Sequence, residues 1–308
     1  MAFDSLICKI NEKNNRTVMG LDPQLSFVPD QIKKIAVSYY GNTPEAAGEA
    51  IFEFCKGLID SSADLLAAVK PQSAFFEMYG IQGMNALYRV IQYAKSAGLY
   101  VILDAKRGDI GSTAAAYATA ILGKTTLIDG GELFEASSAD CITVNPYLGT
   151  DGVKPFIDAA KEFDKSLFVL VKTSNPSSAE FQDIDTLPDE KALYLRVAEK
   201  VSEWGLDTVT GLGYGCVGAV AGATYPRQIA ELRALMPHTF LLIPGYGAQG
   251  GTAKDVALAF DRNKNGAIVN SSRGLMCAYQ SANDDGENYK KLTRDAVIAM
   301  RDDINSAL

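Results

Sequence analysis

The stretch that decides the fold runs Tyr100-Val101-Ile102-Leu103-Asp104-Ala105-Lys106-Arg107-Gly108-Asp109-Ile110-Gly111-Ser112-Thr113. Its first four residues form an apolar run typical of a buried strand, and charged residues follow at once. Charge is costly at the end of a buried strand unless it is paired or functional. Asp104 and Lys106 lie two residues apart, so on a strand their side chains share one face and can pair there. Asp109 lies beyond the strand, on a loop.

Similar short apolar runs recur along the chain and alternate with amphipathic segments. They predict eight strands, at residues 18–22, 65–71, 100–104, 141–145, 167–173, 217–223, 240–244 and 267–270. The runs lack clean polar alternation, as expected of parallel strands that are buried on both faces. Apolar spacing of three and four residues predicts helices at residues 46–61, 75–97, 151–162, 189–204, 226–235, 253–260 and 289–304.

Eight strand–helix units favour an α/β fold, a single (β/α)8 TIM barrel that spans residues 1–308 as one catalytic domain. Such barrels typically have about 250 residues. The additional length therefore predicts loop insertions, at residues 25–44, 117–137, 177–188 and 206–216. A doubly wound open sheet is the alternative architecture that the same alternation allows.

Composition narrows the classes of partner. The net charge of −8 argues against nucleic-acid and acidic-membrane partners, which favour basic surfaces. The five cysteines are scattered without a CxxC pair, which is typical of a reduced, cytoplasmic protein without a disulfide framework or zinc site. No secretion signal is evident, and no apolar run approaches the ~20 residues that span a bilayer. The only histidine, His238, lies in a predicted helix-to-strand connection, so a Ser-His-Asp triad or a multi-histidine metal site is not available within one chain.

Polar residues gather where the predicted strands end, which is where barrel enzymes place their active sites. Besides the Asp104 stretch, three strand ends carry them: Gly20-Leu21-Asp22-Pro23, Val69-Lys70-Pro71-Gln72 and Lys172-Thr173-Ser174-Asn175-Pro176. Any one of these could be a salt bridge at the barrel rim. Together, at the same end of successive strands, they indicate a ligand site.

The last two strand ends indicate an anion site. The seventh strand runs into Pro244-Gly245-Tyr246-Gly247-Ala248-Gln249-Gly250-Gly251, and the eighth into Asn270-Ser271-Ser272-Arg273-Gly274. Glycines let backbone amides approach a ligand closely, and a helix start near Thr252 adds further donors. An arginine can grip phosphate oxygens with two hydrogen bonds. Since the loops after strands 7 and 8 often bind phosphate in this fold, the pair predicts a phosphate-ester site. The glycine-rich stretch 213–222 is interpreted as a close-packing feature instead.

These motifs together resemble those of the orotidine 5′-phosphate decarboxylase family, in particular its longer bacterial subgroup. The resemblance spans residues 20 to 274 and includes Lys70-Pro71-Gln72, the stretch from Asp104 to Thr113, Thr173-Ser174-Asn175-Pro176 and Ser272-Arg273-Gly274. It implies a catalytic array of Lys70, Asp104, Lys106 and Asp109. It further implies ribose contacts from Asp22 and Lys70, a pyrimidine contact from Ser174 and phosphate contacts from Gln249 and Arg273. Asp109 and Thr113 would reach into the neighbouring subunit's site, in a homodimer with shared active sites.

The family's reaction converts orotidine 5′-monophosphate (OMP) to uridine 5′-monophosphate (UMP) and CO₂ in pyrimidine biosynthesis. The resemblance implies neither a metal nor an organic cofactor, so the protein must itself stabilise the carbanion at C6. Lys106 would stabilise this anion and donate the proton to C6. Asp104 would lie near the departing carboxylate and disfavour the ground state.

Three alternatives remain open on the sequence. A related barrel with an Asp-x-Lys strand could bind magnesium and act as a sugar-phosphate decarboxylase or aldolase, although the second strand offers Lys70 where a further acid is needed. A non-catalytic phosphate-binding barrel would need only the anion loops. A purely structural interpretation makes Asp109 a helix N-cap and Asp104–Lys106 a rim ion pair.

Overall fold

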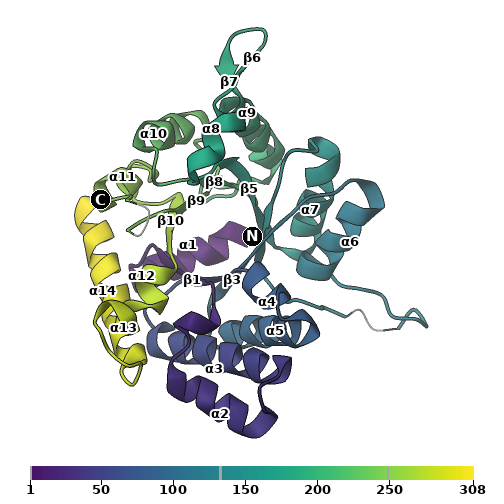
Figure 1. Ribbon diagram of the computed structural model, residues 1–308. Coiled ribbons are helices and arrows are strands. Elements are labelled where there is room, and N and C mark those ends of the chain that lie inside the picture. The colour runs from purple at the N-terminus through teal and green to yellow at the C-terminus, as the bar shows by residue number, and fades with distance from the viewer. Residues whose placement is uncertain (1, 132–133, 248–249) are drawn as a thin grey trace.

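The computed structural model describes residues 2–131, 134–247 and 250–308, which form a closed barrel of eight parallel strands (Figure 1). The strands, in barrel order, are β1 (Thr17–Leu21), β10 (Ala267–Ser271), β9 (Leu241–Pro244), β8 (Val217–Ala221), β5 (Ser166–Lys172), β4 (Cys141–Val144), β3 (Tyr100–Arg107) and β2 (Ala68–Pro71). Because β1 pairs with both β10 and β2, the sheet has no edge. The predicted TIM barrel is confirmed, and the open sheet is wrong.

Helices follow each strand and cover the outside of the barrel (Figure 1). The principal ones are α3 (Pro44–Ser62), α5 (Gly80–Ser96), α6 (Gly111–Leu122), α7 (Thr150–Phe163), α9 (Leu193–Gly205), α10 (Pro226–Leu235), α11 (Ala253–Ala257) and α14 (Tyr289–Ala307). Further elements lie in the connections: α2 (Asp30–Tyr40), α4 (Ala74–Glu77), α8 (Ala179–Gln182), α12 (Arg273–Met276), α13 (Ala278–Ser281) and the 3₁₀ turns η1 (Leu25–Phe27), η2 (Pro176–Ser178) and η3 (Leu206–Thr208). A small hairpin pairs β6 (Asp185–Thr186) with β7 (Lys191–Ala192).

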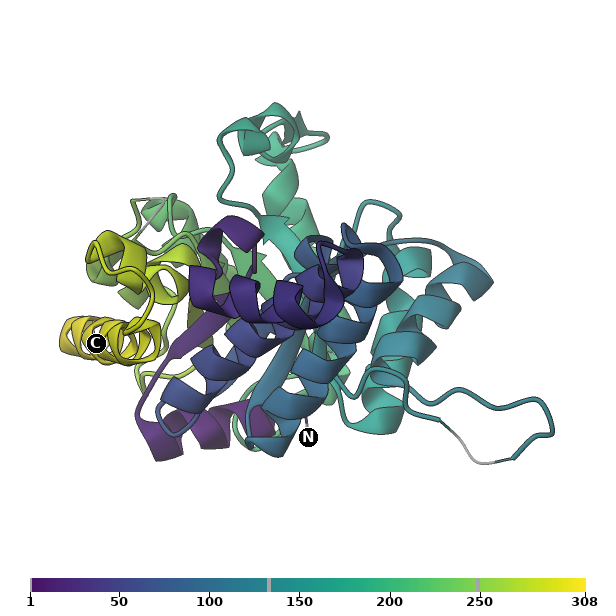
Figure 2. The ribbon, with the colours of Figure 1, turned by 60° about the horizontal axis from the view of Figure 1, so that its bottom comes forward.

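An amino-terminal helix, α1 (Ala2–Lys13), closes the end of the barrel where the strands begin (Figures 1 and 2). Phe3 lies in the barrel interior, with its ring centroid 4.9 Å from that of Phe168 and 5.0 Å from that of Phe240. Our strand–helix interpretation missed α1. Its signal is the apolar spacing of Phe3, Leu6, Ile7 and Ile10, which places four side chains on one helical face.

Several element bounds differ from the predicted ones for local reasons. The strand predicted at 65–71 begins at Ala68, because the amides of Leu65 and Leu66 both donate to Ser62 O and form a turn. The helix predicted at 75–97 is interrupted at Met78–Tyr79, next to Gly80, which has a φ of +61°. The helix predicted at 189–204 starts later because β6 and β7 occupy residues 185–192.

The predicted insertions are only partly correct. Residues 25–44 contain η1 and α2, and residues 177–188 contain most of η2, all of α8 and β6. Residues 117–137 begin inside α6, which was missed because its many alanines give little contrast between its two faces. The described residues that follow α6, 123–131 and 134–137, belong to an arm that projects from the barrel (Figure 2). None of the helices in the described ranges is long and apolar enough to cross a bilayer.

Candidate active site

A buried carboxylate between two ammonium groups forms the centre of the barrel mouth. Lys70 at the end of β2 places its Nζ 2.6 Å from Asp104 Oδ2, and Lys106 places its Nζ 2.6 Å from Asp104 Oδ1. Asp104 and Lys70 are buried, whereas the side chain of Lys106 is 46% exposed. The predicted pairing of Asp104 with Lys106 is therefore present, and Lys70 joins it from the neighbouring strand.

Two further side chains hold the same carboxylate, and sequence reasoning did not assign either to the site. Thr143 on β4 donates to Asp104 Oδ1 at 2.8 Å, and Gln72 donates to Oδ2 at 3.0 Å. Gln72 was visible in the Lys70-Pro71-Gln72 motif. Thr143 lies inside an apolar run, where a single threonine gave no signal.

A bulge in β3 brings Lys106 to Asp104. The pairing of β3 with β4 shifts between Leu103 and Arg107, and Lys106 has a φ of +46°. Such a backbone conformation costs a non-glycine residue about 1–3 kcal/mol. The Lys106 amide donates to Thr143 Oγ1 at 2.9 Å, which pins the bulge to β4. The strand predicted to end at 104 thus continues through an irregular turn that aims the ammonium group.

Asp104 and Lys70, in the array that they form with Lys106, both stay charged. Burial of the Asp104 carboxyl opposes ionisation, but the ammonium groups of Lys70 and Lys106 outweigh it and hold the pKa of Asp104 well below its usual range. Burial disfavours the charged form of Lys70, but Asp104 and Asp22 outweigh it and raise the pKa of Lys70. Around neutral pH this part of the site is an ionised carboxylate beside a buried ammonium group.

Two adjoining cavities open at this array. One, of about 450 Å³, lies beside Lys106 and is lined by Thr173, Ser174 and Gln182. The other, of about 280 Å³, is lined by Asp22, Gly245 and Arg273 among others. Lys70, Asp104 and Pro244 line both cavities, so one elongated ligand could contact the charged array and the last two strand ends at once.

The smaller cavity holds the predicted anion-binding residues that the structure describes. Gly245 and Tyr246 after β9 face Ser272 and Arg273 after β10. Arg273 is exposed and forms no ion pair within residues 2–131, 134–247 and 250–308. Gln249 lies outside the described residues. Helix α11 starts near Thr252, as predicted, with Thr252 as its N-cap. The Thr252 amide donates to the Asp255 carboxylate and the Thr252 hydroxyl accepts from the Asp255 amide, so these two amide donors are already occupied.

Two buried oxygens in the smaller cavity have no hydrogen-bond donor among the described residues: Asp22 Oδ1 and Asn270 Oδ1. A buried acceptor without a donor is costly, so it indicates a place where a ligand hydroxyl or amide donates. Asp22 was predicted as a site residue. Asn270 was quoted at the end of the eighth strand, but no role was assigned to it.

Ser174, for which the resemblance predicts a pyrimidine contact, lines the larger cavity. A Cβ at Gly222 would lie 2.9 Å from Ser174 N and Cα, so only glycine lets the Ser174 backbone pack this closely. The interpretation of this glycine as a close-packing residue agrees with the geometry.

Asp109 and Thr113 line neither of the two cavities. Asp109 accepts a hydrogen bond from Ile110 N, and it forms no ion pair with the described residues. It is not the N-cap of α6, which is Ile110, so the helix-cap alternative is wrong. Thr113 is exposed on the first turn of α6. Four exposed apolar side chains come from α6, its start, and the turn before α7, which packs against α6: Ile110, Tyr117, Tyr147 and Leu148.

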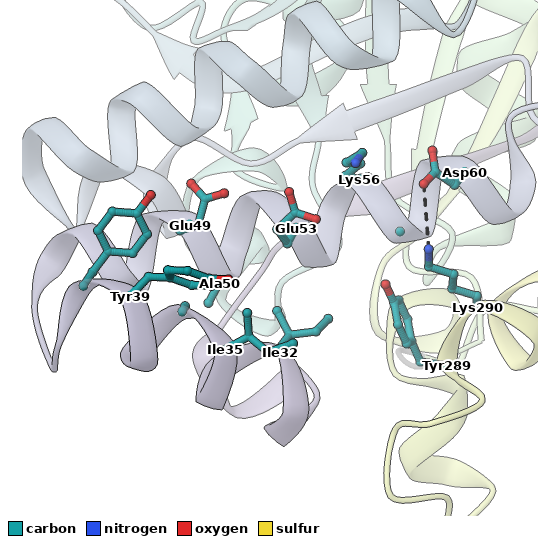
Figure 3. Close-up of a pocket in the computed structure, with 13 residues that line it drawn as sticks. Ile32, Ile35, Tyr39, Glu49, Ala50, Glu53, Lys56, Asp60, Tyr289 and Lys290 are labelled. Atoms are coloured by element: carbon teal, nitrogen blue, oxygen red, sulfur yellow. Dashed lines mark ion pairs between the residues drawn. The ribbon is translucent and has the colours of Figure 1, made fainter.

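A separate groove of about 450 Å³ lies between α2, α3 and α14, on the outside of the barrel (Figure 3). Its walls carry Glu49, Glu53 and Asp60 from α3, with Lys290 3.8 Å from Asp60. It contains none of the strand-end residues described above.

His238, in its predicted loop, is exposed and contacts Gly213 O. In the part of the chain that the structure covers, no three His, Cys, Asp or Glu side chains are grouped as metal ligands.

The fold and the site place the protein among (β/α)8 barrels with a charged array at the carboxyl ends of their strands. The sequence model of the orotidine 5′-phosphate decarboxylase / HUMPS family matches residues 45–291. The chain belongs to this family. It is 41% identical over 305 residues to an orotidine 5′-phosphate decarboxylase of Caldicellulosiruptor saccharolyticus, covering 99% of this chain and 98% of that protein. It is 44% identical over 292 residues to the enzyme of the same name from Rhodopirellula baltica, covering 94% and 93% of the two chains.

Two solved structures of proteins with related names have a similar fold. A crystal structure of a putative orotidine-monophosphate-decarboxylase from Toxoplasma gondii matches with a TM-score of 0.77 and 32% identity, covering 99% of this chain and 98% of that one. An OMP decarboxylase from Leishmania donovani matches with a TM-score of 0.71 and 34% identity, covering 98% and 99%.

Proposed function

We propose that the protein decarboxylates OMP to UMP and CO₂, the reaction for which its relatives are named. We also propose that residues 1–308 form one catalytic domain. The observation that carries the proposal is the Lys70–Asp104–Lys106 array at the junction of the two cavities. The reaction belongs to pyrimidine biosynthesis in the cytoplasm. The five cysteines, all free thiols, fit a reducing compartment.

Preorganised charge can supply the stabilisation that this reaction needs. Loss of CO₂ leaves an electron pair at C6 of the pyrimidine, with no carbonyl placed to delocalise it. The Lys106 ammonium, fixed by Asp104 and by the β3 bulge, would stabilise that anion. Lys106 then donates a proton to C6, which gives UMP.

Asp104 raises the free energy of the bound substrate relative to that of the transition state. Its carboxylate stays ionised, so a substrate carboxylate beside it meets like charge, and that repulsion ends when CO₂ leaves as a neutral molecule. Thr143 and Gln72 hold Asp104 in this position.

The smaller cavity suits the ribose phosphate. Arg273 would bind the phosphate, together with Gln249, and Asp22 would accept a hydrogen bond from a ribose hydroxyl through its free Oδ1. This grip supplies binding energy far from the reacting carbon, which can hold C6 against Lys106. Ser174, in the larger cavity, would contact the pyrimidine.

A homodimer with shared sites would explain where Asp109 and Thr113 lie. We assign the dimer face to exposed Asp109 and Thr113 together with the exposed apolar side chains of Ile110, Tyr117, Tyr147 and Leu148, because grouped exposed apolar side chains mark interfaces. In a twofold dimer built on this face, Asp109 and Thr113 of one subunit enter the partner subunit's site.

The alternative to OMP decarboxylation is a magnesium-dependent reaction on a sugar phosphate, as a decarboxylase or an aldolase. The family description covers more than OMP decarboxylases, because it names a second group, HUMPS. A metal would need the Asp104 oxygens, but ammonium groups lie 2.6 Å from each of them. This observation favours decarboxylation of a nucleotide without metal.

Absorbance loss of OMP, with UMP identified as the product, tests the proposal. We expect full activity after exhaustive chelation. Abolition by the chelator with rescue by Mg²⁺ would instead support the sugar-phosphate alternative, and no reaction with OMP at all would reject the proposed function.

A further inference from the structure

Lys172, the last residue of β5, is a buried cation that the proposed mechanism does not use. Its side chain is 1% exposed. Its Nζ donates to Asp183 Oδ1 at 2.6 Å and to Ser178 Oγ at 3.3 Å. The same Nζ lies 4.6 Å from the ring centroid of Tyr225 and 5.7 Å from that of Tyr194. A buried ammonium with this many partners is built into the structure at a considerable desolvation cost.

These contacts join β5 to the chain that immediately follows it. Residues 173–183, here called the 173–183 segment, include η2 and α8. Asp183 lies at its end, and Gln228 on α10 also donates to Asp183 Oδ1, at 3.4 Å. The ion pair therefore closes the segment back onto the strand from which it departs.

The closed segment supplies the wall of the larger cavity. Thr173, Ser174, Asn175 and Gln182 all line that cavity. Gln182, next to Asp183, accepts from Thr173 N at 2.9 Å and donates to Thr173 Oγ1 at 2.8 Å. Gly222 receives the Ser174 backbone from the other side. Displacing Asp183 would therefore displace Gln182 and, through Thr173, Ser174.

We propose that Lys172 and Asp183 are positioning residues for recognition of the substrate's base: their ion pair holds Ser174 and Gln182 in the cavity wall. The inference rests on the proposed function, because the larger cavity takes the pyrimidine only if the substrate is OMP. Neither residue lines the cavities, so both act through the 173–183 segment.

The test compares ligands with and without a base. In Asp183→Asn we expect the inhibition constant of UMP to rise about tenfold, as for loss of one charge-assisted hydrogen bond, while that of ribose 5-phosphate stays within about twofold. The control is Asp207→Asn, which removes the carboxylate from a 2.6 Å Lys161–Asp207 pair that does not line the cavity and should change neither constant. Equal weakening of both ligands in Asp183→Asn would overturn the proposal.

A second variant separates positioning from folding. Lys172→Met with Asp183→Asn removes both charges, so its thermal stability should return close to that of wild type. We expect the selective loss of UMP affinity to persist. If UMP affinity recovers together with stability, the pair acts only on the fold and the inference is wrong. Wild-type turnover of OMP, measured in parallel, tests the proposed function separately.

Discussion

At the scale of the residue, the site depends on how Asp104 is surrounded. Four side chains from three strand ends converge on its two oxygens: Lys70, Gln72, Lys106 and Thr143. Removing the charge of Asp104 leaves Lys70 buried without its ion-pair partner, which is more costly than never burying the pair.

We therefore expect Asp104→Asn to lower the free energy of unfolding by about 3–5 kcal/mol at neutral pH. The folded-state pKa of Asp104 is depressed, so its stabilising contribution is complete above the unfolded-state pKa of about 4 and is lost as pH falls toward the folded-state value. The difference between variant and wild type should thus be constant from about pH 5 to 8 and shrink below about pH 4. Denaturant unfolding across this range measures the difference between variant and wild type.

The control is Asp158→Asn, at an exposed pair with Lys154, which should cost less than about 1 kcal/mol. A difference between Asp104→Asn and wild type that grows in acid would contradict the depressed pKa.

Arg273 offers a second test at this scale. If it binds the phosphate in the smaller cavity, Arg273→Ala should lower kcat/KM for OMP by about 10- to 100-fold, the effect of losing one charge-assisted hydrogen bond. The loss should largely vanish with the nucleoside orotidine, which has no phosphate. Equal losses on both substrates would assign Arg273 a structural role instead.

Much of this site could be predicted from the sequence, but not all of it. Strand-end acids and lysines are visible because they interrupt apolar runs, as at Asp104 and Lys70. Thr143 is not visible in this way, since its role comes from the β3 bulge that lies opposite it. Lys172 was visible at a strand end, but its partner Asp183 lies in a predicted insertion whose course no periodicity describes.

At the scale of the element, the barrel depends on its strands and also on helix α1, which closes one end of it and is here called the plug. The eight strands were predictable because buried parallel strands are continuous apolar runs. Helix α1 was missed because it precedes the first strand–helix unit. Helix α6 was missed because alanines on both faces hide its amphipathic pattern.

The plug should contribute strongly to stability. Phe3 is buried against Phe168 and Phe240, so Phe3→Ala should lower the free energy of unfolding by about 3–5 kcal/mol. Phe181→Ala, at an exposed phenylalanine, should change it by less than about 0.5 kcal/mol. Urea unfolding compares the two variants. A cost below about 1 kcal/mol for Phe3→Ala would mean that α1 does not plug the barrel in solution.

At the scale of the whole molecule, the central question is whether one chain forms a complete site. Lys70, Asp104 and Lys106 are together in one subunit, whereas Asp109 and Thr113 lie on the apolar face proposed for the dimer. A mixed dimer of one Lys106→Ala chain and one Asp109→Ala chain distinguishes the arrangements.

If Asp109 acts across the interface, one site of the mixed dimer carries both defects and the other carries neither. Activity per mixed dimer should then recover to about half that of wild type. If Asp109 acts within its own chain, each site keeps one defect and mixing restores nothing. Purification through two different affinity tags establishes that the mixed dimer has formed, so failure to recover activity would refute the shared site.

Turnover of Lys106→Ala tests the central claim most directly, because the β3 bulge, the strained Lys106 backbone and the Asp104 ion pair all serve to place this one ammonium group. The variant should bind UMP with near wild-type affinity and lose decarboxylation of OMP by about 10³-fold or more. Lys154→Ala, at an exposed lysine on α7, should keep wild-type turnover. Turnover of Lys106→Ala within about tenfold of wild type would remove Lys106 from the chemistry and contradict the account.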